Sequence, residues 1–346
     1  MRYDTAHMLA SHRLALALAL SGLACTTPRG TLPPPPRPSA AMHWQTKLDV
    51  GHPLVGVIWD VAARRRVGDA ELTARVQAAD LVLVGETHDN PDHHALQAAL
   101  IRAFAARHDP PAVVFEMLDR PQQPAVDATL RAHPGDADAL AQAVGWASSG
   151  WPAWSMYRPV FEAALEAHGT ILAAGLDRGA AVRIAHDGVT ALDPALVQAF
   201  GLGGPLPGDV RAAMRREMSE SHCGLLPEPM LDSMVLVQRA RDAVLAERLH
   251  EGAERGHGAL LIAGAGHVRK DRGVPAQLAR AYGASSVAIG LLQVSAEGTT
   301  PERYAETFDA RVLPFDFVWF TPRANDTDHC AELREHMKAH AGSGAS

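Results

Sequence analysis

The sequence predicts an α/β protein with a mostly parallel central sheet flanked by helices and a smaller inserted all-helical cap. Short apolar stretches rich in Val, Leu and Ile indicate buried strands, and amphipathic stretches between them indicate helices. Two of the intervals between strands are too long for simple crossovers, which predicts the cap. The five strands are expected at residues 81–84, 112–116, 171–178, 260–267 and 286–293.

The strand at residues 81–84 begins the first βα unit and places polar side chains at its end. Gly85 permits a tight turn, Asn90 is a suitable helix N-cap, and Pro91 suits the first helical position. In open α/β sheets, ligands bind beyond the carboxyl ends of the strands. This loop and the helix start carry four candidate residues, which are Glu86, His88, His93 and His94. We expect the helix dipole to keep His93 neutral.

Ionisable residues follow other strands too. Glu116 ends the second strand, Asp177 and Arg178 end the third, and His267 ends the fourth. Residues 85–88 and 264–267 are both Gly-x-x-His directly after a buried strand. In the strand order 3-2-1-4-5, the first and fourth strands are neighbours, so the two motifs are expected to face each other across one crevice.

This predicted crevice has the side chains for either metal binding or catalysis. His88, Glu116 and His267 form a mixed imidazole and carboxylate set that suits a divalent metal ion such as zinc, manganese or iron. Glu86 or His88 is the candidate group for activating water. The alternative is a structural network, in which the histidines pair with the carboxylates and fix the loops.

The cap is expected from helical patterns at residues 120–168 and 190–255. Trp154, Tyr157 and Phe161 fall on one side of a helix, which indicates either a core stripe or a platform for a flat aromatic ligand. In the second case Tyr157 is a candidate phenolate ligand for haem iron, and His222 is a further imidazole donor.

The amino-terminal region predicts export. Residues 14–24 form an apolar run too short to span a bilayer, which is typical of a signal peptide. Cys25 ends this run in the manner of a lipobox, so residues 1–25 predict a signal peptide ending at a lipidated cysteine. Ordinary export with cleavage nearby is the alternative. Residues 26–45 form a proline-rich linker, which is either a semi-rigid spacer or a disordered stub.

The rest of the chain is expected to form one large domain at residues 46–299, followed by an extension at residues 300–346 with a strand at 315–320. A hairpin at residues 56–67 is expected to cover a sheet edge. The net charge of −7, without a long basic run, argues against nucleic acid as a partner. Pairing between Cys223 and Cys330 cannot be deduced from the sequence.

The motifs together resemble the ChaN family of haem-binding lipoproteins, which groups with the Tiki and TraB proteins and the erythromycin esterases. The resemblance rests on the segment from Val84 to His94, Glu116, the cluster around Tyr157, the Gln238 and Asp242 pair, and residues 266–275. It implies a lipoprotein at the outer membrane that binds haem at a homodimer interface through an axial tyrosine. It also matches Glu86, His88, Glu116 and His267 to the superfamily site.

Two functions from different classes follow from these observations. The first is a surface haem-binding lipoprotein that works with the outer-membrane haem and iron uptake machinery. The alternative is a metal-dependent hydrolase, an esterase or a peptidase-like enzyme, which uses the paired Gly-x-x-His crevice.

Overall fold

The computed structural model describes residues 43–335. They all belong to the second of the two units into which the chain divides, Pro36–Ser346. The predicted signal peptide, the lipidation site Cys25 and most of the predicted linker at residues 26–45 lie outside the described residues. Within residues 43–335, no helix combines the length and the apolar character needed to cross a membrane.

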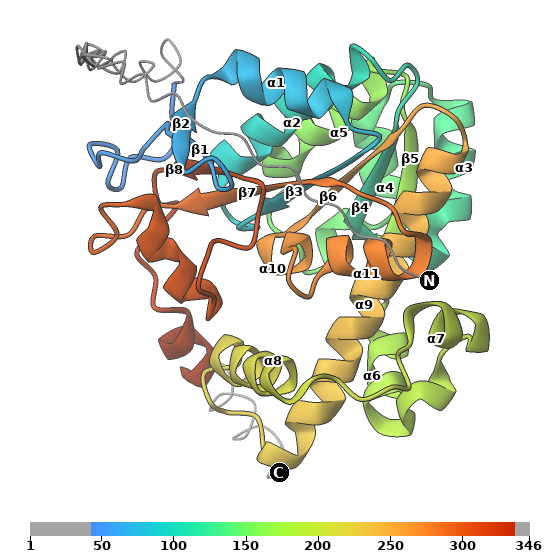
Figure 1. Cartoon of the computed structure of the whole chain (residues 1–346). Helices are drawn as coiled ribbons and strands as arrows, with labels where there is room; N and C mark the ends of the chain where they lie inside the picture. Colours follow the sequence, from blue (N-terminus) through green and yellow to red (C-terminus); the bar gives the residue numbers. More distant parts are fainter. Residues whose placement is uncertain (1–42, 336–346) are drawn as a thin grey trace, which may run out of the picture. The chain divides into compact units, whose positions relative to one another are not determined.

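The centre of the fold is an eight-stranded sheet in the order β2-β1-β8-β7-β3-β6-β4-β5 (Figure 1). The strands from β3 to β8 pair in parallel, whereas β1 and β2 form an antiparallel hairpin at one edge, beside β8. This confirms the mostly parallel sheet predicted from the sequence. The strands are β1 (Ile58–Asp60), β2 (Arg65–Val67), β3 (Leu81–Glu86), β4 (Ala112–Asp119), β5 (Thr170–Gly175), β6 (Ala259–Gly264), β7 (Val287–Gln293) and β8 (Phe317–Thr321).

The observed strand order corrects the predicted one. The prediction that the first and fourth strands are neighbours is confirmed, because β3 pairs with β6. The expectation that the first and second strands are neighbours is wrong, because β6 lies between β3 and β4. As a result, the ends of β3 and β4 both flank the end of β6, where the second Gly-x-x-His motif begins.

Helices cover both faces of the sheet. One face is covered by α1 to α5, and the other by α7, α9, α10 and α11, together with the 3-10 helix η4. The helices are α1 (Asp69–Ala78), α2 (Pro91–Ala105), α3 (Gln123–Ala132), α4 (Ala137–Ala143), α5 (Trp154–Glu166), α6 (Arg178–Asp187), α7 (Pro194–Phe200), α8 (Gly208–Ser221), α9 (Glu228–Glu254), α10 (Ala265–Val268) and α11 (Val274–Tyr282), with 3-10 helices η1 (Arg120–Gln122), η2 (Trp146–Ser148), η3 (Gly188–Ala191) and η4 (Pro301–Phe308).

The first predicted cap segment, residues 120–168, is part of the main body instead. Its buried side chains Val126, Leu140 and Phe161 belong to the same core as Phe115 of β4, and Phe161 stacks on Phe115 with ring centroids 4.2 Å apart. An apolar helix face packs wherever apolar partners are available, and here the sheet supplies them. The expectation of a cap at residues 120–168 is therefore wrong.

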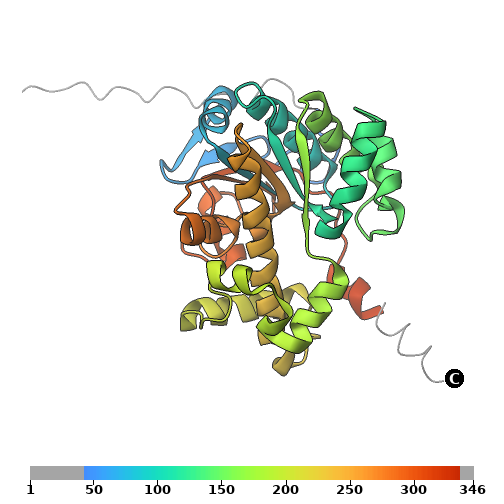
Figure 2. The ribbon, with the colours of Figure 1, turned by 90° about the vertical axis from the view of Figure 1, so that its right-hand side faces the viewer.

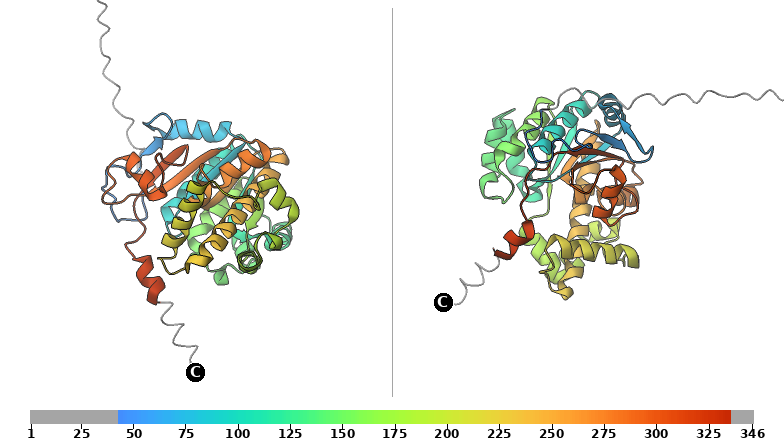
Figure 3. Two further views of the ribbon diagram at one scale, coloured as in Figure 1. Left: turned by 60° about the horizontal axis from the view of Figure 1, so that its bottom comes forward. Right: turned by 90° about the vertical axis from the view of Figure 1, so that its left-hand side faces the viewer.

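The helices that extend beyond the sheet come from the second long interval. The carboxyl-terminal part of α9 packs on the sheet, and its first turns lead away from the strands toward α8, as Figures 2 and 3 show. A small separate core joins α8 to these first turns through Met214, Met218, Leu231 and Val235. The helix α6 packs against the middle of α9.

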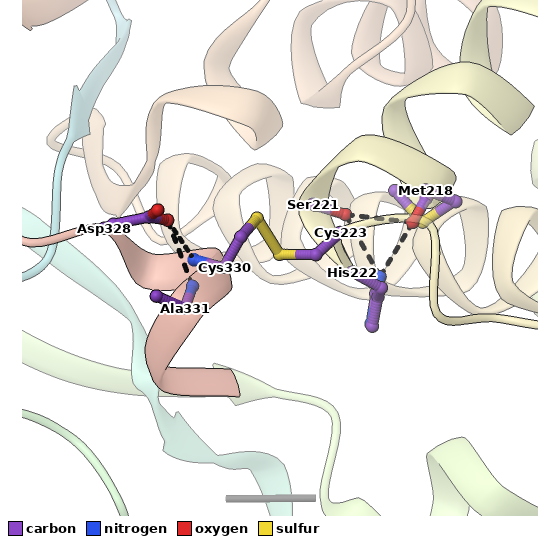
Figure 4. Close-up of a disulfide and its surroundings, with 7 residues drawn as sticks. All are labelled: Met218, Ser221, His222, Cys223, Asp328, Cys330 and Ala331. Carbon is purple, nitrogen blue, oxygen red and sulfur yellow. Dashed lines mark hydrogen bonds between the residues drawn. A yellow bond between two sulfur atoms is a disulfide. The ribbon is translucent and has the colours of Figure 1, made fainter. Parts of the chain in front are cut away.

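The chain after η4 contributes one strand and one covalent link. Strand β8 overlaps the predicted strand at residues 315–320 and ends one residue beyond it, and β8 joins β7 to the β1–β2 hairpin. Cys330, in a helical turn at residues 329–335, forms a disulfide with Cys223 at the end of α8 (Figure 4). The two cysteines whose pairing the sequence leaves open are thus linked across 107 residues.

Candidate functional site

The two Gly-x-x-His motifs meet at the carboxyl ends of β3 and β6, and each glycine accommodates the other motif. A Cβ on Gly85 would lie 2.8 Å from the Cα of Ala265, and a Cβ on Gly264 would lie 3.0 Å from His88 Nε2. The first distance, to a backbone atom, is shorter than real Cβ contacts, and the second is tighter than most of them. The repeated glycine is therefore needed for close packing between the two strand ends.

The first cluster of ionisable groups forms around Glu86, whose side chain is fully buried. The Tyr157 hydroxyl donates to Glu86 Oε1 over 2.6 Å, and His88 Nδ1 donates to the same oxygen over 2.9 Å. His94 Nδ1 lies 2.9 Å from Glu86 Oε2. This second oxygen has no hydrogen bond among the described residues, because the N–H of His94 Nδ1 is directed at Gln97 Oε1, 3.1 Å away.

The charges in this cluster stabilise each other. Burial by itself would raise the pKa of Glu86, but the hydrogen bond from His88 and the positive charges of His94 and His88 lower it far below its usual range. Burial would lower the pKa of His94, yet the Glu86 carboxylate raises it overall. Both ring nitrogens of His94 face oxygen acceptors, as in a charged imidazolium. We therefore describe Glu86 and His94 as a buried ion pair.

The second cluster links three elements through His267. Its Nδ1 donates to Asp242 Oδ1 on α9 over 2.6 Å, and its Nε2 lies 3.3 Å from Glu116 Oε1 on β4. The backbone N–H of Gly264 donates to the other oxygen of Glu116 over 2.7 Å. Burial opposes the charge on His267, but Glu116 and Asp242 raise its pKa to about 10. His267 in turn lowers the pKa of Glu116 to about 2, although burial acts in the opposite direction.

The metal site that the sequence predicts is not seen among the described side chains. Within residues 43–335, no group of three or more histidine, cysteine, aspartate or glutamate side chains is arranged to hold a metal ion. Both nitrogens of His267 face carboxylates. A divalent metal ion shared by His88, Glu116 and His267 stays a prediction. The convergence of Glu86, His88, Glu116 and His267 on one crevice is observed.

Tyr157 lies beneath the crevice instead of on an open wall. Its side chain is fully buried, and its hydroxyl is committed to Glu86. Burial and the Glu86 charge raise the pKa of Tyr157 far above its usual range, which keeps the phenol protonated. Ligation of haem iron by this oxygen would require the phenol to leave Glu86.

His222 is remote from this crevice and lies beside the disulfide. It ends α8, and its Nδ1 bonds to the carbonyl oxygen of Met218 over 2.8 Å, next to Cys223 (Figure 4). The role of His222 in holding a cofactor stays a prediction.

His93 is neutral, as the sequence predicts, but the main cause is burial. Burial lowers its pKa to about 3. Its Nδ1 accepts a hydrogen bond from the Thr87 backbone, and its Nε2 bonds to the Thr321 hydroxyl over 2.8 Å. Both ring nitrogens are thus occupied, and the side chain ties the first βα unit to β8.

Next to the ionised crevice lies an apolar cavity of about 910 Å³ between α6 and α9. The cavity-lining residues of α6 recur at helical spacing, so one face of this helix forms one wall of the cavity. One face of α9 forms another wall. Two arginines, one from each helix, also reach the cavity. The lining residues are Met117, Asp119, Gln122, Val144, Gly145, Ser148, Ser149, Gly150, Trp151, Arg178, Ala181, Val182, Ala185, His186, Met230, Met234, Val237 and Arg241.

The cavity and the crevice share a boundary. Trp151 lines the cavity and packs edge-on against His88, with ring centroids 4.9 Å apart. Asp119 and Arg241 line both the cavity and a much smaller pocket of about 60 Å³ that touches Glu116. Arg241 Nε is buried and has no hydrogen-bond partner among the described residues. The guanidinium groups of Arg178 and Arg241 both line the cavity, so they are candidate partners for an anionic ligand group.

Sequence reasoning missed the cavity residues. Arg178 is part of the third predicted strand end, but Val182, His186 and Arg241 belong to no short motif. The signal that marks them is the spacing 178, 181, 182, 185 and 186, which places small and apolar residues, two cationic side chains and one exposed valine on a single helix face.

The fold and this crevice together define an α/β protein in which a helix-lined cavity adjoins polar strand ends. A family model described as haem-binding uptake, Tiki superfamily, ChaN matches residues 72–278. The chain therefore belongs to the ChaN family of the Tiki superfamily. A comparison with curated proteins finds no match.

Two solved structures are similar to this chain. The structure of ChaN of Campylobacter jejuni, described as showing cofacial haem binding, is similar with a TM-score of 0.56 and 22% identity, over 76% of this chain and 95% of that chain. A mutant of the erythromycin esterase EreC in its open conformation is similar with a TM-score of 0.42 and 12% identity, over 75% of this chain and 95% of that chain.

Proposed function

We propose that this protein binds haem in the cavity between α6 and α9 and serves as an exported carrier in haem and iron uptake. Family membership supports the haem chemistry. The observation that carries the proposal is an apolar cavity of about 910 Å³ whose lining includes two arginines, Arg178 and Arg241. A volume of this size lies in the range of pockets that enclose small organic ligands.

The lining of the cavity suits the chemistry of haem. Haem has a flat apolar ring and two anionic propionates. The walls offer Val182 and Val237 with several methionines for the ring, and Arg178 with Arg241 for the propionates. Asp119 is the opposing charge in the lining. Burial, with help from nearby Asp177, raises the pKa of Asp119.

A pair of neighbouring substitutions on α6 tests this assignment. Val182 and Arg183 are both exposed, but only Val182 lines the cavity. A carboxylate on the apolar wall would be desolvated by a bound ring, so Val182→Asp should weaken haem binding at least tenfold, while Arg183→Asp should leave it nearly unchanged. Haemin titration followed by Soret absorbance and by tryptophan fluorescence measures both. Equal affinities in the two variants would place haem elsewhere.

We also propose that the protein is exported and lipidated at Cys25 and delivers haem to uptake machinery at the outer membrane. The disulfide between Cys223 and Cys330 supports export, because disulfides persist mainly in oxidising compartments. Membrane fractionation of Cys25→Ala tests the anchor, because the variant should be released from membranes. Size-exclusion chromatography with and without haemin tests the homodimer.

One observation favours hydrolysis as a second candidate function. His88 Nδ1 donates to the Glu86 carboxylate, and the His88 side chain is 36% exposed at the crevice. A histidine oriented in this way by a carboxylate is the arrangement of a general base. Incubation of the metal-free protein with a panel of carboxylic esters tests this candidate. An activity that persists in His88→Gln would argue against it.

A further inference from the structure

The chain after β8 connects the crevice to the far end of α8. We call residues 322–335 the strap. At the start of the strap, Asn325 Nδ2 donates to Asp89 Oδ2 over 2.6 Å, and Asp89 directly follows the first Gly-x-x-His motif. Further along, Cys330 forms the disulfide with Cys223, and the red turn at the end of the described chain lies beside the end of α8 in Figure 1. The strap therefore links the loop of the crevice to the end of α8.

The α8–α9 hairpin consists of these two helices and the turn between them, and we call residues 218–230 its tip. Among the described residues, the hydrogen bonds and ion pairs of the tip all stay inside the hairpin, as does the ion pair of Glu228 with Arg215. Just before the tip, ion pairs such as Arg216 with Asp309 hold α8 to the main body. In this part of the chain, the disulfide is therefore the bond that fixes the tip to another part of the fold.

The first turns of α9, which adjoin the tip, form a wall of the cavity. Met230 and Met234 line the cavity, and Met234 also packs against the small core shared with α8. A displacement of the tip would therefore move this wall. The chain advances five residues from Asn325 to Cys330 and can span at most about 18 Å. While the disulfide is intact, the strap limits how far the tip and the wall can move away from the crevice.

The disulfide is within reach of a reductant. Cys223 and Cys330 are both half-buried, and the neighbouring residues Gly224 and Ala331 are exposed. Figure 4 shows the bond between the end of α8 and the strap. Exposed disulfides are more readily reduced than buried ones, and disulfides with a regulatory role are typically of this kind.

We propose that the disulfide between Cys223 and Cys330 is a redox modification site, and that its reduction by a dithiol frees the tip from the strap and opens the cavity. One thiolate of the dithiol attacks a sulfur of the bond and forms a mixed disulfide, which the second thiolate then cleaves. Both protein cysteines become thiols by gaining two electrons and two protons, and the dithiol becomes a disulfide. Access to the cavity changes in this way whichever ligand the cavity takes, so the test needs no haem.

Hydrogen–deuterium exchange of the full chain, followed by mass spectrometry, measures the motion of the tip. It compares the oxidised protein, the protein reduced with dithiothreitol and the double variant Cys223→Ser/Cys330→Ser, and alkylation of both cysteines confirms the reduction. Acrylamide quenching of Trp151, which lines the cavity, measures access. The contribution of Trp151 is the difference between each protein and the same protein with Trp151→Phe. Arg216→Gln, which breaks the ion pair with Asp309 and leaves the disulfide intact, is the matched control.

We expect reduction and the double variant each to speed exchange of the tip amides about tenfold or more, and to raise the quenching constant of Trp151 about twofold or more. Exchange of the β3 and β6 amides should stay the same, because these strands lie in the middle of the sheet. The reductant should change nothing in the double variant, and Arg216→Gln should match the parent.

Equal exchange of the tip amides with the disulfide intact and cut would overturn the proposal. Faster exchange of the tip without a change in the quenching of Trp151 would also overturn it, since the disulfide would then not control the cavity. Faster exchange in β3 and β6 as well would show a bond that stabilises the whole fold instead of the tip, which is the third result that contradicts the proposal.

Discussion

The crevice at the strand ends and the cavity between α6 and α9 lie side by side but are built on opposite principles. In the crevice, ionisable groups such as Glu86 and His267 are buried and pair with each other. In the cavity, Val182 and Met230 remain exposed, and Arg241 keeps an unpaired nitrogen. The ionisable groups that look most reactive in the sequence therefore pair with one another. The side chains that remain able to contact a ligand belong to no sequence motif.

The largest expected effect comes from breaking the buried ion pair. Glu86→Gln keeps the shape of the side chain but leaves the His94 imidazolium without its carboxylate. Removing one partner of a buried ion pair costs about 3–5 kcal/mol, so we expect a loss of that size in the free energy of unfolding measured with urea. Glu71→Gln, which breaks the exposed pair with Arg65, is the control and should change it little. Similar losses in both variants would contradict a stabilising crevice.

The pH dependence of stability gives the second test of the crevice. The pKa of His267 is raised from 6.5 to about 10 on folding. The stabilisation from its charged form is therefore complete below pH 6.5 and is lost as the pH rises through about 10. Between pH 7.5 and 10 the parent should lose ~2 kcal/mol or more, by urea unfolding, than His267→Gln loses. Parallel curves for the two proteins would show that His267 is not charged in the native state.

A smaller loss is expected when only one hydroxyl is removed. Tyr157→Phe takes one hydrogen-bond donor from the buried Glu86 carboxylate, which should cost about 1–3 kcal/mol in the free energy of unfolding. Tyr282→Phe, at a half-buried position on α11, should cost less. The haem spectrum should be the same in both variants. A changed spectrum in Tyr157→Phe alone would return the axial ligand to the crevice.

The smallest effect on stability is expected in the cavity. Val182 is 61% exposed, so Val182→Ala should change the free energy of unfolding by less than about 0.5 kcal/mol. Leu96→Ala, in the core next to the crevice, should cost about 2–5 kcal/mol. Thermal melts and haemin titrations of the two variants should give opposite rankings, with Val182→Ala weaker in haem affinity and Leu96→Ala weaker in stability.

The sequence predicts the strands well because buried parallel strands are continuous apolar runs with little ambiguity. The adjacency of β3 and β6 is also predicted, and the paired glycines explain it physically through their close packing. The position of β4 beside β6 was not predictable in this way, because no local pattern records which strand a crossover returns to. Because this position was not predicted, the hydrogen bond from the backbone N–H of Gly264 to the Glu116 carboxylate was not predicted either.

The chemistry of the crevice is harder to predict from the sequence than the position of the crevice in the fold. The residues of the crevice converge as expected, but whether His267 binds a metal or carries a proton depends on Asp242, which comes from a helix about 25 residues earlier. Likewise, the linear sequence offers Tyr157 as a plausible iron ligand. Only the packing of α5 under the crevice shows that its side chain is buried and that its hydroxyl is bonded to Glu86.

Strand β8 has a consequence for any attempt to shorten this protein. It separates β7 from the β1–β2 hairpin, and His93 bonds to Thr321 at its end. A chain cut at residue 300 would lose β8 and leave β7, with six of its seven residues buried, as a bare apolar sheet edge. Such an edge is a template for intermolecular strand pairing and aggregation. Recombinant fragments that end at the family boundary near residue 278 would lack both strands, so soluble production requires the chain through at least residue 323.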